Sequence, residues 1–211
     1  MKILIIGGGK LPEKETLIKE YGESDYVICA DKGGEYLFNA GLNPTILIGD
    51  LDSISQEALT AFKQNEVKIE KFPAEKDYTD TELCVYKALE QNPDEIIMLG
   101  CTGSRVDHLL GNLGLLKLCL DRNVKAVIKD ENNEIFLIDK PLFLKGEQGK
   151  LISLQAYSSE VSNINLKGVK YPLKGYNLKP WSPFTVSNVI NDSEVEITFT
   201  EGILMVILPK D

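Results

Sequence analysis

The 211-residue chain lacks any run of apolar residues long enough to cross a membrane. A membrane helix needs about 20 consecutive apolar residues, and every uncharged apolar run here is far shorter. The first eleven residues hold one lysine and a short Ile-Leu run, but three glycines and then acidic residues follow. That order is typical of a first strand and turn and not of a signal peptide. We therefore expect a cytoplasmic protein with no membrane partner.

Cysteine and positive charge are also scarce. The four cysteines have no metal-type spacing and lie in apolar segments, which predicts reduced, buried thiols (Cys29, Cys84, Cys101 and Cys119). The chain has 23 basic and 32 acidic residues, a formal charge of −9. Such a balance argues against a nucleic-acid partner, and it favours a cationic small substrate or an anion bridged by a metal ion.

Two common nucleotide-binding motifs are absent. The first glycine turn, Gly7-Gly8-Gly9-Lys10, lacks the Ser/Thr residue and the spacing of a Walker A loop, and it is not GxGxxG. It indicates either a phosphate contact or only a tight turn from strand to helix. Internal repeats and low-complexity segments are lacking as well.

The N-terminal part of the chain alternates short apolar runs with helical patterns. Predicted strands cover 2–6, 25–30, 46–49, 67–72, 94–99, 124–129 and 134–138, and predicted helices follow most of them. This alternation is typical of an α/β fold, here a Rossmann-like, doubly wound, mostly parallel sheet over residues 1–140. Ligands of such sheets bind outside the carboxyl ends of the strands.

The pattern changes after about residue 141. Short β-runs at 151–157, 161–166, 185–190, 195–200 and 203–208 are separated by turn residues, and no helical stretch is evident. These runs predict an antiparallel β-sandwich domain over residues 141–211.

The segment that stands out is Ile46–Ser53, an apolar strand that ends in Asp50 and Asp52. If the chain stays extended, the two acids point to the same side because strand residues alternate between faces. Carboxylate oxygens at a strand's end suit Mg²⁺, which binds through few carboxylates and substrate phosphates. The alternative is a strand end followed by an Asp-Ser turn that caps the next helix.

Further polar residues follow other predicted strands. Asp31 ends the strand 25–30, and Asp77 and Asp80 precede a helix for which Thr79 and Glu82 have capping-box spacing. The helix dipole alone explains Asp80 well and Asp77 less well. These acids, like Asp50 and Asp52, are all expected at the same edge of the sheet, and this shared placement favours a functional site at that edge.

The glycine turn at 100–105 opens a helix that runs to Leu120. Arg105 is suited to bidentate contact with phosphate, whereas the lone histidine, His108, has either a structural or a functional role. Gly111 and Gly114 each cost the helix about 1 kcal/mol, which indicates close packing or a ligand. One face of this helix is expected to be an apolar stripe that packs in the core, formed by Leu109, Leu113, Leu116 and Leu120. A different face carries the polar residues Arg105, His108 and Asn112.

Taken in order, these motifs resemble the thiamine pyrophosphokinase family over nearly the whole chain. The matching segments are Asp31-Lys32-Gly33, Gly49-Asp50-Leu51-Asp52-Ser53, Lys76-Asp77-Tyr78-Thr79-Asp80, Gly100–His108 with Asn112, Gly168–Leu173 and Ser187-Asn188. The resemblance implies an α/β catalytic domain, a β domain that binds thiamine and forms a homodimer, and a thiamine cleft between domains of different subunits.

The same resemblance implies the reaction and its residues. The enzyme would transfer the pyrophosphoryl group of ATP to the hydroxyl of thiamine, giving thiamine diphosphate and AMP, with Mg²⁺ as cofactor. The implied metal ligands are Asp50, Asp52 and Asp80, and the other catalytic residues are Asp77, Arg105 and Asp107. ATP would contact Asp31, Lys76, Thr79, Gly103, Arg105, His108 and Asn112. Thiamine would contact Tyr171, Trp181, Ser187 and Asn188.

Two other functions use the same residues. A magnesium-dependent nucleotide phosphohydrolase would activate water at the same acids, and it would release product from ATP without thiamine. A regulator that binds nucleotide or thiamine without turnover is the non-enzymatic alternative.

Overall fold

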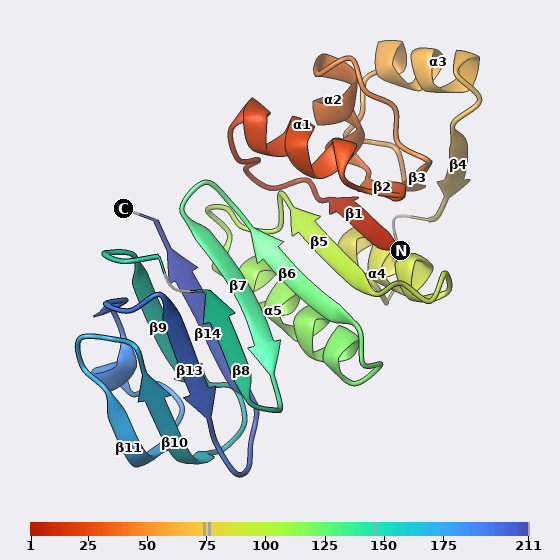
Figure 1. The fold of residues 1–211 in the computed structure, drawn as a ribbon. Coiled ribbons are helices and arrows are strands. Elements are labelled where there is room, and N and C mark those ends of the chain that lie inside the picture. Colours follow the sequence, from red (N-terminus) through yellow and green to blue (C-terminus); the bar gives the residue numbers. More distant parts are fainter. Residues whose placement is uncertain (74, 76, 146, 211) are drawn as a thin grey trace. The chain divides into compact units, whose positions relative to one another are not determined.

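The computed structural model describes residues 1–211 except 74, 76, 146 and 211. The chain divides into two compact units, Met1–Glu131 and Asn132–Asp211 (Figure 1). The domain boundary expected at 140/141 lies beyond the end of strand β7 (Asn133–Ile138), which the division assigns to the second unit.

The first unit is built on a parallel sheet. Its strands lie in the order β6-β5-β1-β2-β3-β4, and every adjacent pair is parallel. Their bounds are β1 (Lys2–Ile6), β2 (Tyr26–Ala30), β3 (Ile46–Gly49), β4 (Lys68–Lys71), β5 (Glu95–Leu99) and β6 (Lys125–Lys129). The central strands are buried and almost wholly apolar, as strands covered on both faces must be. The order reverses between β1 and β5, which confirms a doubly wound sheet.

Five helices cover this sheet on both faces (Figure 1). They are α1 (Lys14–Gly22), α2 (Lys32–Asn39), α3 (Gln56–Gln64), α4 (Asp80–Leu89) and α5 (Val106–Leu120). Two begin at side-chain caps: the hydroxyls of Ser55 and Thr79 accept the backbone N–H of Ala58 and Glu82. The cap at Thr79 fixes the first turn of α4 at Asp80, as its sequence spacing predicts. None of the described helices is both long and apolar enough to cross a membrane.

The buried face of α5 differs from the predicted stripe. Leu115, Leu116 and Cys119 are buried, whereas only Leu116 of the four predicted leucines is. Nine of its fifteen residues are apolar and they include neighbouring positions, so periodicity could not fix its orientation. A Cβ atom added at Gly111 or Gly114 would have no described neighbour within 4 Å. Close packing within the described chain therefore does not explain these glycines.

The second unit is a sandwich of two antiparallel sheets, which confirms the predicted architecture. One sheet has the order β12-β9-β14-β7 and the other β11-β10-β13-β8. The bounds are β8 (Leu142–Lys145), β9 (Leu151–Ala156), β10 (Val161–Lys167), β11 (Leu173–Leu178), β12 (Asn188–Val189), β13 (Glu194–Thr198) and β14 (Leu204–Pro209). One core cluster joins apolar side chains of both sheets.

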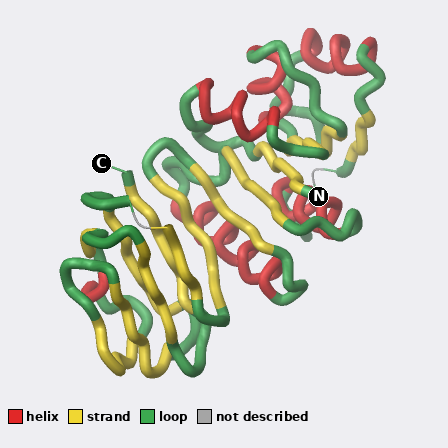
Figure 2. Tube along the Cα trace, in the orientation of Figure 1, coloured by secondary structure: helices red, strands yellow, loops and turns green. Residues whose placement is uncertain are grey.

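Two details of this unit depart from the sequence expectation. Strands β8 and β11 were not predicted, because β8 has only four residues, LFLK, and β11, LKGYNL, contains a glycine and no regular alternation of apolar and polar residues. The predicted strand 185–190 is mostly a loop (Figure 2), with a 3-10 turn at Pro183–Thr185 and strand pairing only at Asn188–Val189. The four cysteines are buried and free, as expected.

Candidate functional site

Two glycine loops meet at the point where the strand order of the first unit reverses. The loop after β1 donates three backbone hydrogen bonds to the loop after β5: Gly7 to Leu99 (2.8 Å), Gly9 to Gly100 (2.8 Å) and Lys10 to Thr102 (3.1 Å). A Cβ atom at Gly9 would lie 2.2 Å from the carbonyl oxygen of Thr102, so only glycine allows this approach. These three amides are used within the turn, as the interpretation of a tight turn from strand to helix expects.

Three carboxylates lie together beside this point. One oxygen each of Asp31, Asp50 and Asp52 lies within 4.8 Å of the others. Asp31 follows β2, and the other two follow β3, so the parallel direction of neighbouring strands brings them to one edge. Gly49 permits the approach, because a Cβ atom there would lie 2.8 Å from the Cβ of Asp31. The convergence expected for Asp50 and Asp52 therefore includes Asp31, which the sequence interpretation assigned to ATP.

Asp31 is held in an unfavourable state. Its backbone has a positive φ of 38°, the residue is only 8% exposed, and Oδ1 has no hydrogen-bond partner among the described residues. Burial raises the pKa of this carboxyl, and Ser53 lowers it in part, while the charges of Asp50, Asp52 and Asp80 raise it further. A buried, unpaired carboxylate oxygen facing two further carboxylates is a site that a cation would stabilise.

The two acids after β3 converge through a turn and not through an extended strand. The strand ends at Gly49, and Leu51 has a positive φ of 68°. The N–H of Asp52 donates to Asp50 Oδ1 (3.0 Å), and the hydroxyl of Ser53 donates to Asp52 Oδ1 (2.7 Å). The prediction that an extended backbone aligns these acids was therefore wrong in its reason, although the acids do meet.

Glu35 fixes the end of this turn. Its carboxylate accepts the N–H of Ser55 at 2.9 Å and the hydroxyl of Ser55 at 3.2 Å. Because Glu35 lies on α2 and Ser55 caps α3, the pair ties the turn to the helix that follows Asp31. Sequence reasoning missed Glu35 and Ser53, since nothing local marks a contact across twenty residues.

The site residues predicted around the start of α4 lie in different surroundings. Asp80 is close enough to Asp31 to raise its pKa, and it is the first residue of α4. Asp77 is exposed and is not part of the carboxylate group found among the described residues. Thr79 uses its hydroxyl to cap α4. Lys76 lies outside the described residues.

Arg105 and Asp107 form an exposed pair at the start of α5. Arg105 Nε and Nη2 donate to the two carboxylate oxygens of Asp107, at 3.2 Å and 2.6 Å. This guanidinium lowers the pKa of Asp107 to about 2, and the carboxylate raises that of Arg105. Asp107 therefore pairs with Arg105, and exposure leaves the pair easy to open. His108 is exposed one residue further on.

The glycine turn after β5 is tied to α5 by Asn112. Its amide Nδ2 donates to the carbonyl oxygen of Cys101 at 2.7 Å. Gly103 lies at the tip of this turn, where its added Cβ would be 3.7 Å from the backbone nitrogen of Lys10. Asn112, expected to contact ATP, thus holds the loop that carries Gly103 and Arg105.

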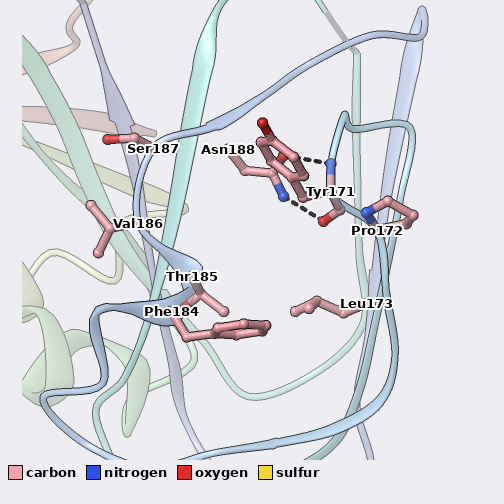
Figure 3. A pocket seen from close by; sticks show the side chains of 8 residues that line it. All are labelled: Tyr171, Pro172, Leu173, Phe184, Thr185, Val186, Ser187 and Asn188. Atoms are coloured by element: carbon pink, nitrogen blue, oxygen red, sulfur yellow. Dashed lines mark hydrogen bonds between the residues drawn. The ribbon is translucent and has the colours of Figure 1, made fainter.

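The second unit has a cavity of its own, about 300 Å³ in volume (Figure 3). Its size is at the lower end of the range of small-molecule sites. The lining combines aromatic and aliphatic side chains with a few polar groups: Tyr171, Pro172, Leu173, Phe184, Thr185, Val186, Ser187 and Asn188. Three of the four residues expected to bind thiamine therefore lie around one cavity.

The polar residues of this cavity are engaged within the protein. The amide of Asn188 accepts the N–H of Tyr171 (3.0 Å) and donates to its carbonyl oxygen (2.7 Å). The N–H of Ser187 donates to Ser153 Oγ (2.9 Å), and the Ser187 hydroxyl points away from Tyr171 in Figure 3. The side chain of Tyr171 is 60% exposed, and Lys170 Nζ lies 5.3 Å from its ring centroid.

Aromatic residues around the cavity differ from the expected set. Trp181 is 88% exposed with a positive φ of 63°, and it does not line the cavity. Phe184 does line it and stacks on Tyr176, with ring centroids 4.9 Å apart. Sequence reasoning missed Phe184, because a single aromatic residue after Pro183 in a loop has no periodic signal.

Comparisons with known proteins agree with both halves of this description. The family model described as "Thiamin pyrophosphokinase, catalytic domain" matches residues 18–128, and the one described as "Thiamin pyrophosphokinase, vitamin B1 binding domain" matches residues 142–204. The chain belongs to the thiamine pyrophosphokinase family.

Two bacterial members of this family are similar to the chain over almost their full length. Thiamine pyrophosphokinase of Bacillus subtilis (strain 168) is 33% identical over 211 residues, covering 99% of each chain. Its crystal structure has a TM-score of 0.90, with all of both chains covered. Thiamin pyrophosphokinase of Geobacillus thermodenitrificans is 32% identical with a TM-score of 0.86, covering 100% of this chain and 98% of that one. The Candida albicans protein, at 17% identity and a TM-score of 0.83, shares the fold.

Membership in the thiamine pyrophosphokinase family makes the chain an enzyme, a transferase of the kinase type. None of these relatives supports the alternative of a magnesium-dependent nucleotide phosphohydrolase.

Proposed function

We propose that the chain transfers the pyrophosphoryl group of ATP to the hydroxyl of thiamine, giving thiamine diphosphate and AMP. The observation that carries the proposal is the group of Asp31, Asp50 and Asp52, with its unpartnered buried oxygen, in a chain of this family. The chain would thereby complete thiamine diphosphate biosynthesis. We assign ATP and Mg²⁺ binding to residues 1–140, and thiamine binding and dimerisation to residues 141–211.

The three carboxylates fit a magnesium ion. Oxygens on opposite sides of Mg²⁺ are about 4.2 Å apart, and these three already lie within 4.8 Å of one another. We therefore propose Asp31 as a ligand together with Asp50 and Asp52, and Asp80 as a fourth carboxylate that holds metal-bound water. When bound, the ion neutralises negative charge on the phosphate oxygens of ATP.

The remaining residues of the first unit orient ATP. Arg105 turns from Asp107 to the phosphates, which costs little because the pair is exposed. His108 and the backbone of Gly103 lie on the same loop and helix start, so they are proposed to contact the nucleotide. The roles proposed for Asp77 in catalysis and for Lys76 in ATP binding rest on the sequence motif alone.

Thiamine carries a positive charge and a flat ring system, and the cavity of the second unit offers matching groups. The Tyr171 ring already has the Lys170 ammonium 5.3 Å from its centroid, so it can accept a cation at that distance. Phe184 provides a second aromatic wall, and Trp181 is an exposed aromatic close by in sequence. Ser187 is proposed to hydrogen-bond the aminopyrimidine after a side-chain rotation.

The reaction requires little covalent chemistry of the protein. The thiamine hydroxyl attacks the β-phosphorus of ATP, and the α-oxygen leaves with AMP. The proton of the hydroxyl passes to a carboxylate, for which Asp52 and Asp80 are the candidates. Positioning and electrostatic stabilisation supply the rest of the rate.

The decisive assay incubates the chain with ATP, Mg²⁺ and thiamine and measures AMP and thiamine diphosphate. We expect AMP release to require thiamine. Release of phosphate or AMP at the same rate without thiamine would support the phosphohydrolase function instead.

Asp50→Asn is expected to abolish turnover while the fold stays intact, because it removes a charged ligand from the carboxylate group. The rate should fall at least about 100-fold at saturating Mg²⁺, with an unchanged circular dichroism spectrum. The matched control is Asp139→Asn, at an exposed acid for which the structure gives no partner. A normal steady-state rate for Asp50→Asn would remove Asp50 from the metal site.

We also propose that the chain acts in the cytoplasm as a homodimer. Support comes from the family and from large apolar side chains left exposed in each unit, such as Val106, Leu110 and Trp181.

A further inference from the structure

We infer that Asn188 is a positioning residue, which acts on thiamine only by holding Tyr171. The sequence motif suggested a direct contact with the substrate. The inference rests on the proposed thiamine site, and it follows from the partners of the Asn188 amide.

The hydrogen bonds of Asn188 leave its oxygen no capacity for a ligand. Oδ1 accepts two backbone N–H groups, that of Tyr171 at 3.0 Å and that of Val189 at 2.9 Å. An amide oxygen has two lone pairs, so both are in use. A substrate amino group would need that oxygen as its acceptor. The side chain is also only 7% exposed.

The nitrogen of the same amide faces Tyr171 as well. Nδ2 donates one of its two N–H groups to the Tyr171 carbonyl oxygen at 2.7 Å, so both backbone groups of Tyr171 bind one side chain (Figure 3). The second N–H belongs to a residue that is only 7% exposed, which leaves it little access to a ligand. Because Oδ1 meets donors and Nδ2 meets an acceptor, the orientation of the amide is the one the network requires.

This contact extends a strand pairing that the backbone cannot continue. Val169 pairs with Ile190, and the N–H of Lys170 donates to the Val189 carbonyl at 2.8 Å. Tyr171 comes next, opposite Asn188, and there the contacts that the structure gives run to the Asn188 side chain. The side-chain amide of Asn188 takes the place of the missing backbone partner. It thereby fixes Tyr171 at the rim of the cavity.

The geometry assigns this role to asparagine in particular. Aspartate keeps an acceptor for the Tyr171 N–H but places a second oxygen against the Tyr171 carbonyl, and it buries a charge. Alanine removes all three bonds of the amide, two of them to the backbone groups of Tyr171 and one to the Val189 N–H. Glutamine is longer by one methylene and would displace the Tyr171 segment from the cavity.

A double-mutant cycle between Asn188→Ala and Tyr171→Ala tests the inference. For the single variant Asn188→Ala we expect KM for thiamine to rise about 10-fold, with kcat and KM for ATP within about twofold of wild type. In the Tyr171→Ala background the same change should alter KM for thiamine by less than about twofold. Equal fold-changes in both backgrounds would mean that the amide contacts thiamine itself and would overturn the inference, as would an unchanged KM in the single variant.

A second readout follows the contact directly. In the protein labelled with ¹⁵N-tyrosine, the Tyr171 N–H should exchange with solvent faster in Asn188→Ala than in wild type, whereas Asn191→Ala, at an exposed position in the same segment, should leave it unchanged. Unchanged exchange in Asn188→Ala would overturn the inference that Asn188 holds Tyr171. If the alanine variant does not fold, Asn188→Ser replaces it in both measurements.

The tests separate this inference from the proposed function. If the wild-type chain formed no thiamine diphosphate, the proposed function would fail. The cycle would then be measured as thiamine binding by calorimetry. Absence of thiamine binding in the wild type would overturn the substrate role of Asn188, whatever the exchange measurement shows.

Discussion

Asp31 shows at the scale of one residue how a binding site conflicts with folding. Its carboxylate is buried among other acids with one oxygen unpaired, and its backbone takes a conformation that is uncommon for residues other than glycine. Both features are unfavourable in the absence of a ligand. An ion at this position would remove the electrostatic part of the cost.

The pKa of Asp31 gives the sign of its effect on stability. A carboxyl whose folded pKa is raised disfavours folding once the pH exceeds its unfolded pKa of about 3.9, and the penalty disappears as the pH falls below that value. At neutral pH the metal-free chain therefore carries a penalty from this carboxylate.

Asp31→Asn should therefore stabilise the metal-free chain at pH 7. We expect a gain of about 1 kcal/mol, or roughly 2–4 °C in Tm, because the charge is removed and asparagine tolerates a positive φ better. Thermal unfolding with and without excess Mg²⁺ measures this effect. The rise in Tm that Mg²⁺ gives the wild type should be lost in the variant. A lower Tm of the variant without metal, or a response to Mg²⁺ equal to that of the wild type, would contradict the assignment of Asp31 as a metal ligand. Asp139→Asn again serves as the control.

At the scale of elements, loops and not strands carry the functional groups, and glycines decide how closely the loops approach. Gly9 and Gly49 have Cβ positions that neighbouring atoms already occupy, at 2.2 Å and 2.8 Å. Gly111 in α5 has open space around it. The same residue type therefore has opposite roles at the sheet edge and in the helix.

Gly9→Ala and Gly111→Ala should change stability in opposite directions. The first forces the loops after β1 and β5 apart and should cost about 1–3 kcal/mol. The second replaces a poor helix residue and should add up to about 1 kcal/mol. Urea unfolding compares the two variants directly. Equal destabilisation by both would mean that the surroundings of Gly111 are occupied in solution, for example by a second subunit.

At the scale of the whole molecule, the proposed metal site and the cavity proposed for thiamine belong to different compact units. The proposed reaction needs both, and the proposed homodimer would supply them from different subunits. Asp50 of one subunit and Tyr171 of the other would then serve one site.

Mixed dimers test this arrangement. We expect co-expression of Asp50→Asn and Tyr171→Ala chains to restore about a quarter of wild-type activity, since half of the randomly formed dimers are mixed and each has one intact site. Each variant alone is the control, together with sedimentation to establish the dimer. If both residues served a site within one subunit, no mixed dimer would have an intact site and activity would stay at the level of the single variants.

The sequence by itself determined most of the elements, the two-part architecture and the edge of the sheet where a site is expected. Periodicity and turn residues act over a few positions, and a parallel sheet puts the ends of all its strands on one side. For this reason the acids after β2 and β3 were found without coordinates. The family resemblance rests on those same local motifs.

Only the tertiary structure decided which side chains meet. Asp31 joins Asp50 and Asp52 because Gly49 lets two loops touch, Leu51 turns the chain where an extended strand was expected, and the Asn188 amide reaches Tyr171 across 17 residues. Such contacts depend on the path of the backbone between distant segments. That path is fixed by the packing of the whole unit and not by the residues on either side of each contact.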